Sequence, residues 1–141
     1  MSNITITKEE IQAIYPKVAE IIADALACDE EEVTPQASLI NDLGAESIDF
    51  LDFVFRLERT FKVKIPRGKI VEDARGSLSE QEFENGGLVS EAGLAQLKEY
   101  MDEVPADRFP EKLKSADIAK LFTAETFCKT VIRQQKIDAQ G

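Results

Sequence analysis

Residues 42–49 read Asp42-Leu43-Gly44-Ala45-Glu46-Ser47-Ile48-Asp49, which places one serine between two acids at the start of a hydrophobic segment. Gly44 lets the backbone turn just before this serine, because glycine has no Cβ to restrict its torsion angles. Glu46 and Asp49 lie where the dipole of a helix N-terminus favours negative charge. The stretch therefore predicts an exposed serine at the start of a helix. Serine is also a preferred N-cap residue, so an ordinary capping role for Ser47 is an alternative interpretation.

The segment that follows predicts one amphipathic helix over residues 47–61, because its apolar residues recur at spacings of three and four. On this helix we expect an inward face formed by Ile48, Leu51, Val54, Phe55 and Leu57. The outward face would carry Asp49, Asp52, Arg56 and Arg59. The helix must end before Pro66, since the residue preceding a proline is pushed out of the α region.

A first helix is predicted upstream, over residues 7–27, by a stripe of apolar residues at helical spacing. Thr7 followed by Glu10 fits a capping box at its start. Pro16 predicts either a kink or a later start near Tyr15, because a proline inside a helix removes one backbone hydrogen bond.

Further helices are predicted downstream, and the sequence contains no convincing strand. Ser90 to Met101 favours a short helix, residues 115–122 a helical turn, and Thr123 a cap for a last helix that runs to Gln135. The sequence therefore predicts an all-α fold. We expect a single domain over residues 1–141, a small helical bundle in which residues 67–114 form an insertion before the last helix.

Composition and charge exclude several classes of function. The 141 residues carry 17 basic and 27 acidic side chains, a net charge of −10, which disfavours binding to nucleic acid and favours basic protein partners. No stretch approaches the roughly 20 apolar residues of a membrane span, and the N-terminus does not resemble a signal peptide. We therefore expect a cytoplasmic protein without a transmembrane segment.

The residues give little support for catalysis or for a resident metal. A serine nucleophile needs a base, usually histidine, and the chain contains no histidine. Cys28 and Cys128 lack the spacing of a zinc site and are interpreted as small core thiols. Glu46 and Asp49 could help to hold magnesium transiently, but the helix dipole alone explains them. Ser47 is therefore interpreted as a site of modification.

The stretch around Ser47, the helix that follows and the closing Phe61-Lys62-Val63-Lys64-Ile65-Pro66 together resemble the acyl carrier protein family. Members of that family have an Asp-Ser-Leu signature after Leu-Gly, then an acidic and apolar helix that ends near an Ile-Pro pair. Here Glu46-Ser47-Ile48 replaces Asp-Ser-Leu. The resemblance covers residues 7–66 well, residues 115–135 loosely and residues 67–114 poorly.

This resemblance implies an acyl-carrier-like four-helix bundle that is a carrier and not an enzyme. Ser47 would receive 4′-phosphopantetheine from coenzyme A through a separate phosphopantetheinyl transferase, and the thiol of the arm would then carry acyl groups as thioesters. The carrier would bind acyl-loading and acyl-transfer enzymes through their basic patches, and we expect it to act as a monomer. Partner-binding residues would be Glu46, Ile48, Asp49, Asp52 and Glu58, and the acyl pocket would be lined by Leu51, Val54 and Phe55.

The insertion resembles the elaborations of specialised carriers, including those that serve very-long-chain acylation of lipid A. The sequence therefore favours a carrier in a specialised fatty-acid or lipid pathway. Two alternatives remain open at this stage. The arm could carry amino acids or polyketide intermediates, or the chain could be an unmodified interaction protein that uses its acidic helix to bind partners.

Overall fold

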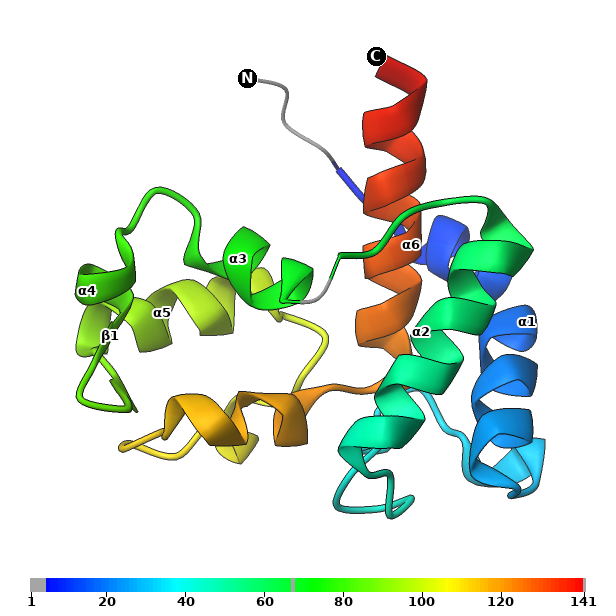
Figure 1. Ribbon diagram of the computed structural model, residues 1–141, viewed down its shortest axis with the longest axis horizontal. Helices are drawn as coiled ribbons and strands as arrows, with labels where there is room; N and C mark the ends of the chain where they lie inside the picture. The colour runs from blue at the N-terminus through cyan, green and yellow to red at the C-terminus, as the bar shows by residue number, and fades with distance from the viewer. Residues whose placement is uncertain (1–4, 67, 141) are drawn as a thin grey trace.

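The computed structural model describes residues 5–66 and 68–140, and over these ranges the chain is mostly helical. Three long helices, α1 (Lys8–Leu26), α2 (Ser47–Phe61) and α6 (Ala124–Gln140), lie side by side on one side of the molecule (Figure 1). A group of shorter elements occupies the other side. The prediction of an all-α fold with additional helices is therefore confirmed.

Helix α1 packs against both α2 and α6, and the buried side chains between them form the core of the bundle. Its fully buried members include Val18, Ile22, Phe53, Leu57, Phe127 and Val131. These side chains come from all three helices, so the helices share one apolar interior. Burial of this surface is the main favourable contribution to the stability of the bundle.

Helix α1 begins with the predicted capping box. The N–H of Glu10 donates to Thr7 Oγ1 at 3.2 Å, and the N–H of Thr7 donates to Glu10 Oε1 at 2.9 Å. The alternative start near Tyr15 is wrong, because the helix continues through Pro16. Pro16 has no N–H to donate to the carbonyl one turn earlier in the helix. It lies on the exposed side of α1, where water can donate a hydrogen bond to that carbonyl instead.

Helix α2 begins and ends as predicted, but it turns a different face to the core. Phe53 and Leu57 are buried and Phe50 is half-buried, whereas Ile48, Leu51 and Phe55 are 69%, 56% and 56% exposed. The expectation that these three face inward is therefore wrong. Both stripes have the same spacing of three and then four residues, so helical periodicity could not choose between them. The buried stripe contains two phenylalanines, which bury more apolar surface than the other stripe would.

The segment between α2 and α6 contains the short elements on the left of Figure 1. They are α3 (Lys69–Arg75), α4 (Glu80–Phe83), the strands β1 (Glu84–Asn85) and β2 (Leu88–Val89), α5 (Glu91–Tyr100), and the 3₁₀ helices η2 (Ala106–Arg108) and η3 (Ser115–Leu121). A further 3₁₀ turn, η1 (Glu30–Glu32), follows α1. Helix α5 and the turn of η3 match the prediction, whereas α3, α4 and the hairpin were not predicted.

A close contact fixes α5 on α4. A Cβ atom on Gly93 would lie only 2.4 Å from the carbonyl oxygen of Phe83, so only glycine permits this approach. Ser90 caps α5, because its hydroxyl oxygen accepts a hydrogen bond from the N–H of Gly93 at 2.9 Å. The insertion therefore has ordered local structure of its own.

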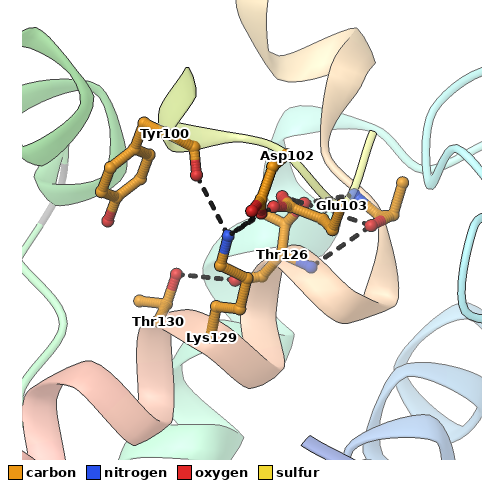
Figure 2. Close-up of polar contacts among 7 residues, drawn as sticks. Tyr100, Asp102, Glu103, Thr126, Lys129 and Thr130 are labelled. Atoms are coloured by element: carbon orange, nitrogen blue, oxygen red, sulfur yellow. Dashed lines mark hydrogen bonds and ion pairs between the residues drawn. The ribbon is translucent and has the colours of Figure 1, made fainter. Parts of the chain in front are cut away.

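A partly buried polar cluster joins the segment at the end of α5 to α6 (Figure 2). Lys129 Nζ donates to Asp102 at 2.7 Å, to Glu103 at 2.8 Å and to the carbonyl of Tyr100 at 3.0 Å. The Thr126 hydroxyl donates to the other oxygen of Glu103 at 2.6 Å. Burial lowers the pKa of Lys129, but the charges and hydrogen bonds of Glu103 and Asp102 outweigh it, so that the pKa is raised overall.

Candidate functional site

Ser47 is exposed and is the first residue of α2, at the end of an ordered loop. Gly44 has a φ of +72°, a conformation that favours glycine. The next residue, Ala45, is buried, and its N–H donates to the carbonyl of Leu39 at 2.8 Å. The loop therefore folds back on itself just before α2 and presents Ser47 at a defined position.

The N-cap of α2 is Glu46 and not Ser47. The N–H groups of Asp49 and Phe50 donate to the carbonyl of Glu46, at 2.9 and 3.2 Å, and the Asp49 carboxylate accepts the N–H of Glu46 at 2.8 Å. The capping role considered for Ser47 is therefore wrong. The N–H groups of Ser47 and Ile48 head the helix, where no earlier turn supplies acceptors, and such groups suit a phosphate.

The predicted acidic residues all lie on or beside α2, but several already have partners within the chain. Asp52 is paired with Arg56 at 3.0 Å. The Glu58 carboxylate accepts the N–H of Ile65 at 2.7 Å and so holds the segment that follows the helix. Glu46 is exposed and lies directly beside Ser47. The negative charge that is most available to a partner is thus at the N-terminal end of α2.

The residues expected to line an acyl pocket do not meet inside the bundle. Leu51 and Phe55 are directed to solvent and Val54 is half-buried, so the expectation of an interior pocket lined by these three residues is wrong for this conformation. The exposed Phe55 ring instead lies 5.4 Å from the guanidinium carbon of Arg59. Together with Ile48, the exposed side chains form an apolar stripe that begins one residue after Ser47.

Four phenylalanine rings fill the space beneath α2. Phe50, Phe53, Phe122 and Phe127 contact one another with ring centroids 5.0–6.1 Å apart, in tilted and edge-to-face arrangements. Aromatic pairs in such arrangements are favourable beyond the area that they bury. The density of aromatic residues in α2 was the available signal for this cluster, but helical spacing alone did not place it.

Neither cysteine offers reactive chemistry near this site. Burial raises the pKa of Cys128 to about 12, and burial is also the main cause of a raised pKa at Cys28. The thiolate is the reactive form, so both thiols are poor nucleophiles at neutral pH. Within residues 5–66 and 68–140, no group of three or more acidic or cysteine side chains is placed to hold a metal ion.

The same described part of the chain contains no helix long and apolar enough to cross a membrane. The candidate site is an exposed serine at the N-terminus of α2, beside acidic and apolar side chains that are available to a partner.

Comparisons with known proteins agree with this arrangement. The family described as "Phosphopantetheine attachment site" matches residues 16–75. The chain is 40% identical over 72 residues to the acyl carrier protein AcpXL of Rhizobium etli, a match that covers 50% of this chain and 78% of that protein. It is 38% identical over 74 residues to the AcpXL of Rhizobium meliloti, covering 52% of this chain and 78% of the relative.

A third relative, an acyl carrier protein of Syntrophobacter fumaroxidans, is 42% identical over 57 residues, which cover 40% of this chain and 70% of that protein. No solved structure gives a significant match. Phosphopantetheine is the cofactor of the matched domain, and carriers of this kind are not catalysts. The chain belongs to the acyl carrier protein family.

Proposed function

We propose that Ser47 carries 4′-phosphopantetheine and that the thiol of this arm carries acyl groups as thioesters. The observation that carries the proposal is the position of Ser47, exposed on the first turn of α2 and not needed as its cap. A phosphodiester at this position would lie beside the N–H groups that head the helix. The bound arm supplies the thiol on which the cargo is held.

The residues around Ser47 fit a serine that is modified by another enzyme. Transfer from coenzyme A forms a bond between the Ser47 oxygen and the phosphorus next to the pantetheine. The bond from this phosphorus to the bridging pyrophosphate oxygen breaks, so that adenosine 3′,5′-bisphosphate leaves, and the hydroxyl proton leaves to a base. The chain has no histidine, and we assign that base to the phosphopantetheinyl transferase. The exposure of Ser47 leaves room for a second protein to approach it.

The N-terminal half of α2 is proposed as the surface that partner enzymes bind. Glu46 and Asp49 offer negative charge beside Ser47, and Ile48 and Leu51 offer exposed apolar area on the same helix. Basic patches on transferases and acyl-handling enzymes would be steered to this charge, while the apolar side chains would contribute once contact is made. Such encounters are fast and exchangeable, as a shuttle requires.

We place the carrier in a specialised lipid pathway, such as the very-long-chain acylation of lipid A that its resemblance implies. The similarity to proteins named AcpXL and the segment of extra elements before α6 support this assignment. General fatty-acid synthesis does not explain why the chain keeps an ordered insertion of this size.

Intact-mass spectrometry tests the attachment site. The purified protein is incubated with coenzyme A, magnesium and a broad-specificity phosphopantetheinyl transferase. We expect one phosphopantetheine on the wild type and on Ser77→Ala, which removes another exposed serine, and none on Ser47→Ala. Addition to Ser47→Ala would show that the assignment is wrong.

Charge reversal tests the partner surface. Glu46→Lys should slow loading severalfold at low salt, and the effect should shrink as salt screens the charges. Glu9→Lys is a matched control, because Glu9 is likewise an exposed acid at the start of a helix. Equal loading rates for Glu46→Lys and Glu9→Lys would show that the transferase does not contact the N-terminal end of α2.

A further inference from the structure

A groove with a volume of about 410 Å³ lies between the loop that leads to Ser47 and the last part of the insertion. Asn41 and Asp42 line it from the loop, and Leu113, Lys120 and Leu121 line it from the opposite side. One wall therefore belongs to the segment that presents Ser47. The other belongs to the insertion and to η3, the 3₁₀ helix that follows it.

Hydrogen bonds hold the two walls together. The Ser38 hydroxyl donates to the carbonyl of Lys120 at 2.8 Å, and the N–H of Leu39 donates to the carbonyl of Phe122 at 3.1 Å. The side chain of Arg108 donates to the carbonyl of Gln36. The groove is thus bounded by segments that are fixed to each other, so its shape does not depend on a loose loop.

The lining of the groove has two chemical parts. Leu113 and Leu121 are buried and contribute apolar surface, whereas Asn41, Asp42 and Lys120 are exposed and polar. The amide of Asn41 can both donate and accept hydrogen bonds. A flexible chain that alternates amide groups with short apolar segments would satisfy both parts, and a pantetheine arm is such a chain.

The groove is close to the first turn of α2 along the chain. Asn41 precedes Ser47 by six residues, and six fully extended residues span at most about 22 Å. The loop between them is far from extended, because the N–H of Gly44 donates to the carbonyl of Ile40 at 3.1 Å and Ala45 is bonded back to Leu39. A long arm attached to Ser47 therefore starts within reach of this groove.

The four phenylalanine rings beneath α2 contact one another, so an arm could enter the bundle at that place only by displacing them. We propose that the prosthetic arm on Ser47 lies in the groove between the Ser38–Asp42 loop and the segment from Arg108 to Leu121. The insertion then shelters the arm between encounters with partner enzymes. This inference rests on the proposed attachment at Ser47.

Tryptophan fluorescence offers a direct test, because the chain contains no tryptophan of its own. Lys120→Trp places the only indole on the rim of the groove. Loading of the arm should lower the quenching of this indole by acrylamide about twofold, because a molecule seated in a groove covers most of the surface there. Mass spectrometry on the same samples establishes that the arm is attached.

Lys17→Trp is a closely matched control. Lys17 and Lys120 are each 51% exposed, and each is paired with an acid three residues away, at 3.5 and 3.2 Å. Quenching in Lys17→Trp should not change on loading. Unchanged quenching in a loaded Lys120→Trp protein would overturn the inference, whereas failure of the wild type to load would contradict the proposed function itself.

Amide NMR spectra of the wild type provide a second test that needs no substitution in the groove. Loading should shift the signals of Asn41, Leu113 and Leu121 in addition to those of the first turn of α2. Shifts confined to residues 44–50 would place the arm in solvent and overturn the inference. Both measurements report the position of the arm independently of any acyl-transfer activity.

Discussion

A serine at the start of a helix can have two different roles, and the residue before it separates them here. Glu46 occupies the N-cap of α2, so Ser47 is free of the capping function that serine often performs. At α1 the situation is the opposite, because the Thr7 hydroxyl is the cap and bonds to the N–H of Glu10. Two hydroxyl residues at the starts of two helices therefore contribute differently to stability.

This difference gives a prediction at the scale of single residues. Thr7→Ala should lower the free energy of unfolding by about 1 kcal/mol, because a capping hydrogen bond is lost. Ser47→Ala should change it by less than about 0.5 kcal/mol, since an exposed side chain without a cap role is removed. Urea denaturation of the two variants beside the wild type measures both. A larger loss for Ser47→Ala would mean that its hydroxyl has a structural role.

At the scale of elements, α2 separates a buried aromatic stripe from an exposed apolar one. Phe53 and Phe55 belong to the same helix and are the same residue type, yet the first is fully buried and the second is 56% exposed. The buried ring contacts Phe50 and Phe127. The exposed ring continues the apolar stripe of Ile48 and Leu51, which lie in the surface that we propose for partner enzymes.

Substitution of these two phenylalanines tests the assignment of the faces. Phe53→Ala should cost about 3–5 kcal/mol, because it removes a ring from a packed core. Phe55→Ala should cost much less and should instead weaken binding to partner enzymes. Thermal or urea unfolding gives the first comparison, and the rate of loading by the transferase gives the second. Equal destabilisation by the two variants would contradict the face that we describe.

The sequence predicted the helices of the bundle better than their orientation. The capping box at Thr7, the start at Ser47 and the stop before Pro66 are local signals, and the structure follows all three. The face of α2 depends on Phe122 and Phe127, which lie far away in the chain. The short α3 and α4 have too few turns to show a periodic pattern, so they could not be predicted from spacing.

At the scale of the whole molecule, a small, partly buried cluster connects the insertion to the bundle (Figure 2). The side chains of Lys129 and Glu103 are only 15% and 4% exposed and lie 2.8 Å apart. Because the insertion also lines the groove near Ser47, the position of that groove wall depends on how the insertion is held. Sequence spacing could not predict the pairing of Glu103 with Lys129, because the two residues meet only through the tertiary structure.

Loss of this pair should destabilise the protein. Lys129→Met leaves the Glu103 carboxylate buried without its charged partner, which should cost about 3 kcal/mol. The double variant Glu103→Leu with Lys129→Met should recover part of this loss, because no unpaired charge remains buried. Urea denaturation of the single and double variants gives their free energies of unfolding, and hence the coupling energy between Glu103 and Lys129. A negligible loss in Lys129→Met would show that the cluster does not hold the insertion.

The same cluster predicts a pH dependence. The pKa of Lys129 is raised in the folded protein, so its stabilising contribution is complete below the unfolded pKa near 10.4 and is lost as the pH rises through the folded pKa. The free energy of unfolding should therefore fall more steeply above about pH 10.4 in the wild type than in Lys129→Met. Parallel curves for the two proteins would contradict this assignment.

The central claim, that Ser47 holds the prosthetic arm, is tested most directly on protein purified from its native host. Peptide fragmentation by tandem mass spectrometry locates any modification to a single residue. We predict phosphopantetheine, free or acylated, on Ser47. A native protein that is wholly unmodified, or one that carries the arm on another residue, would contradict the claim.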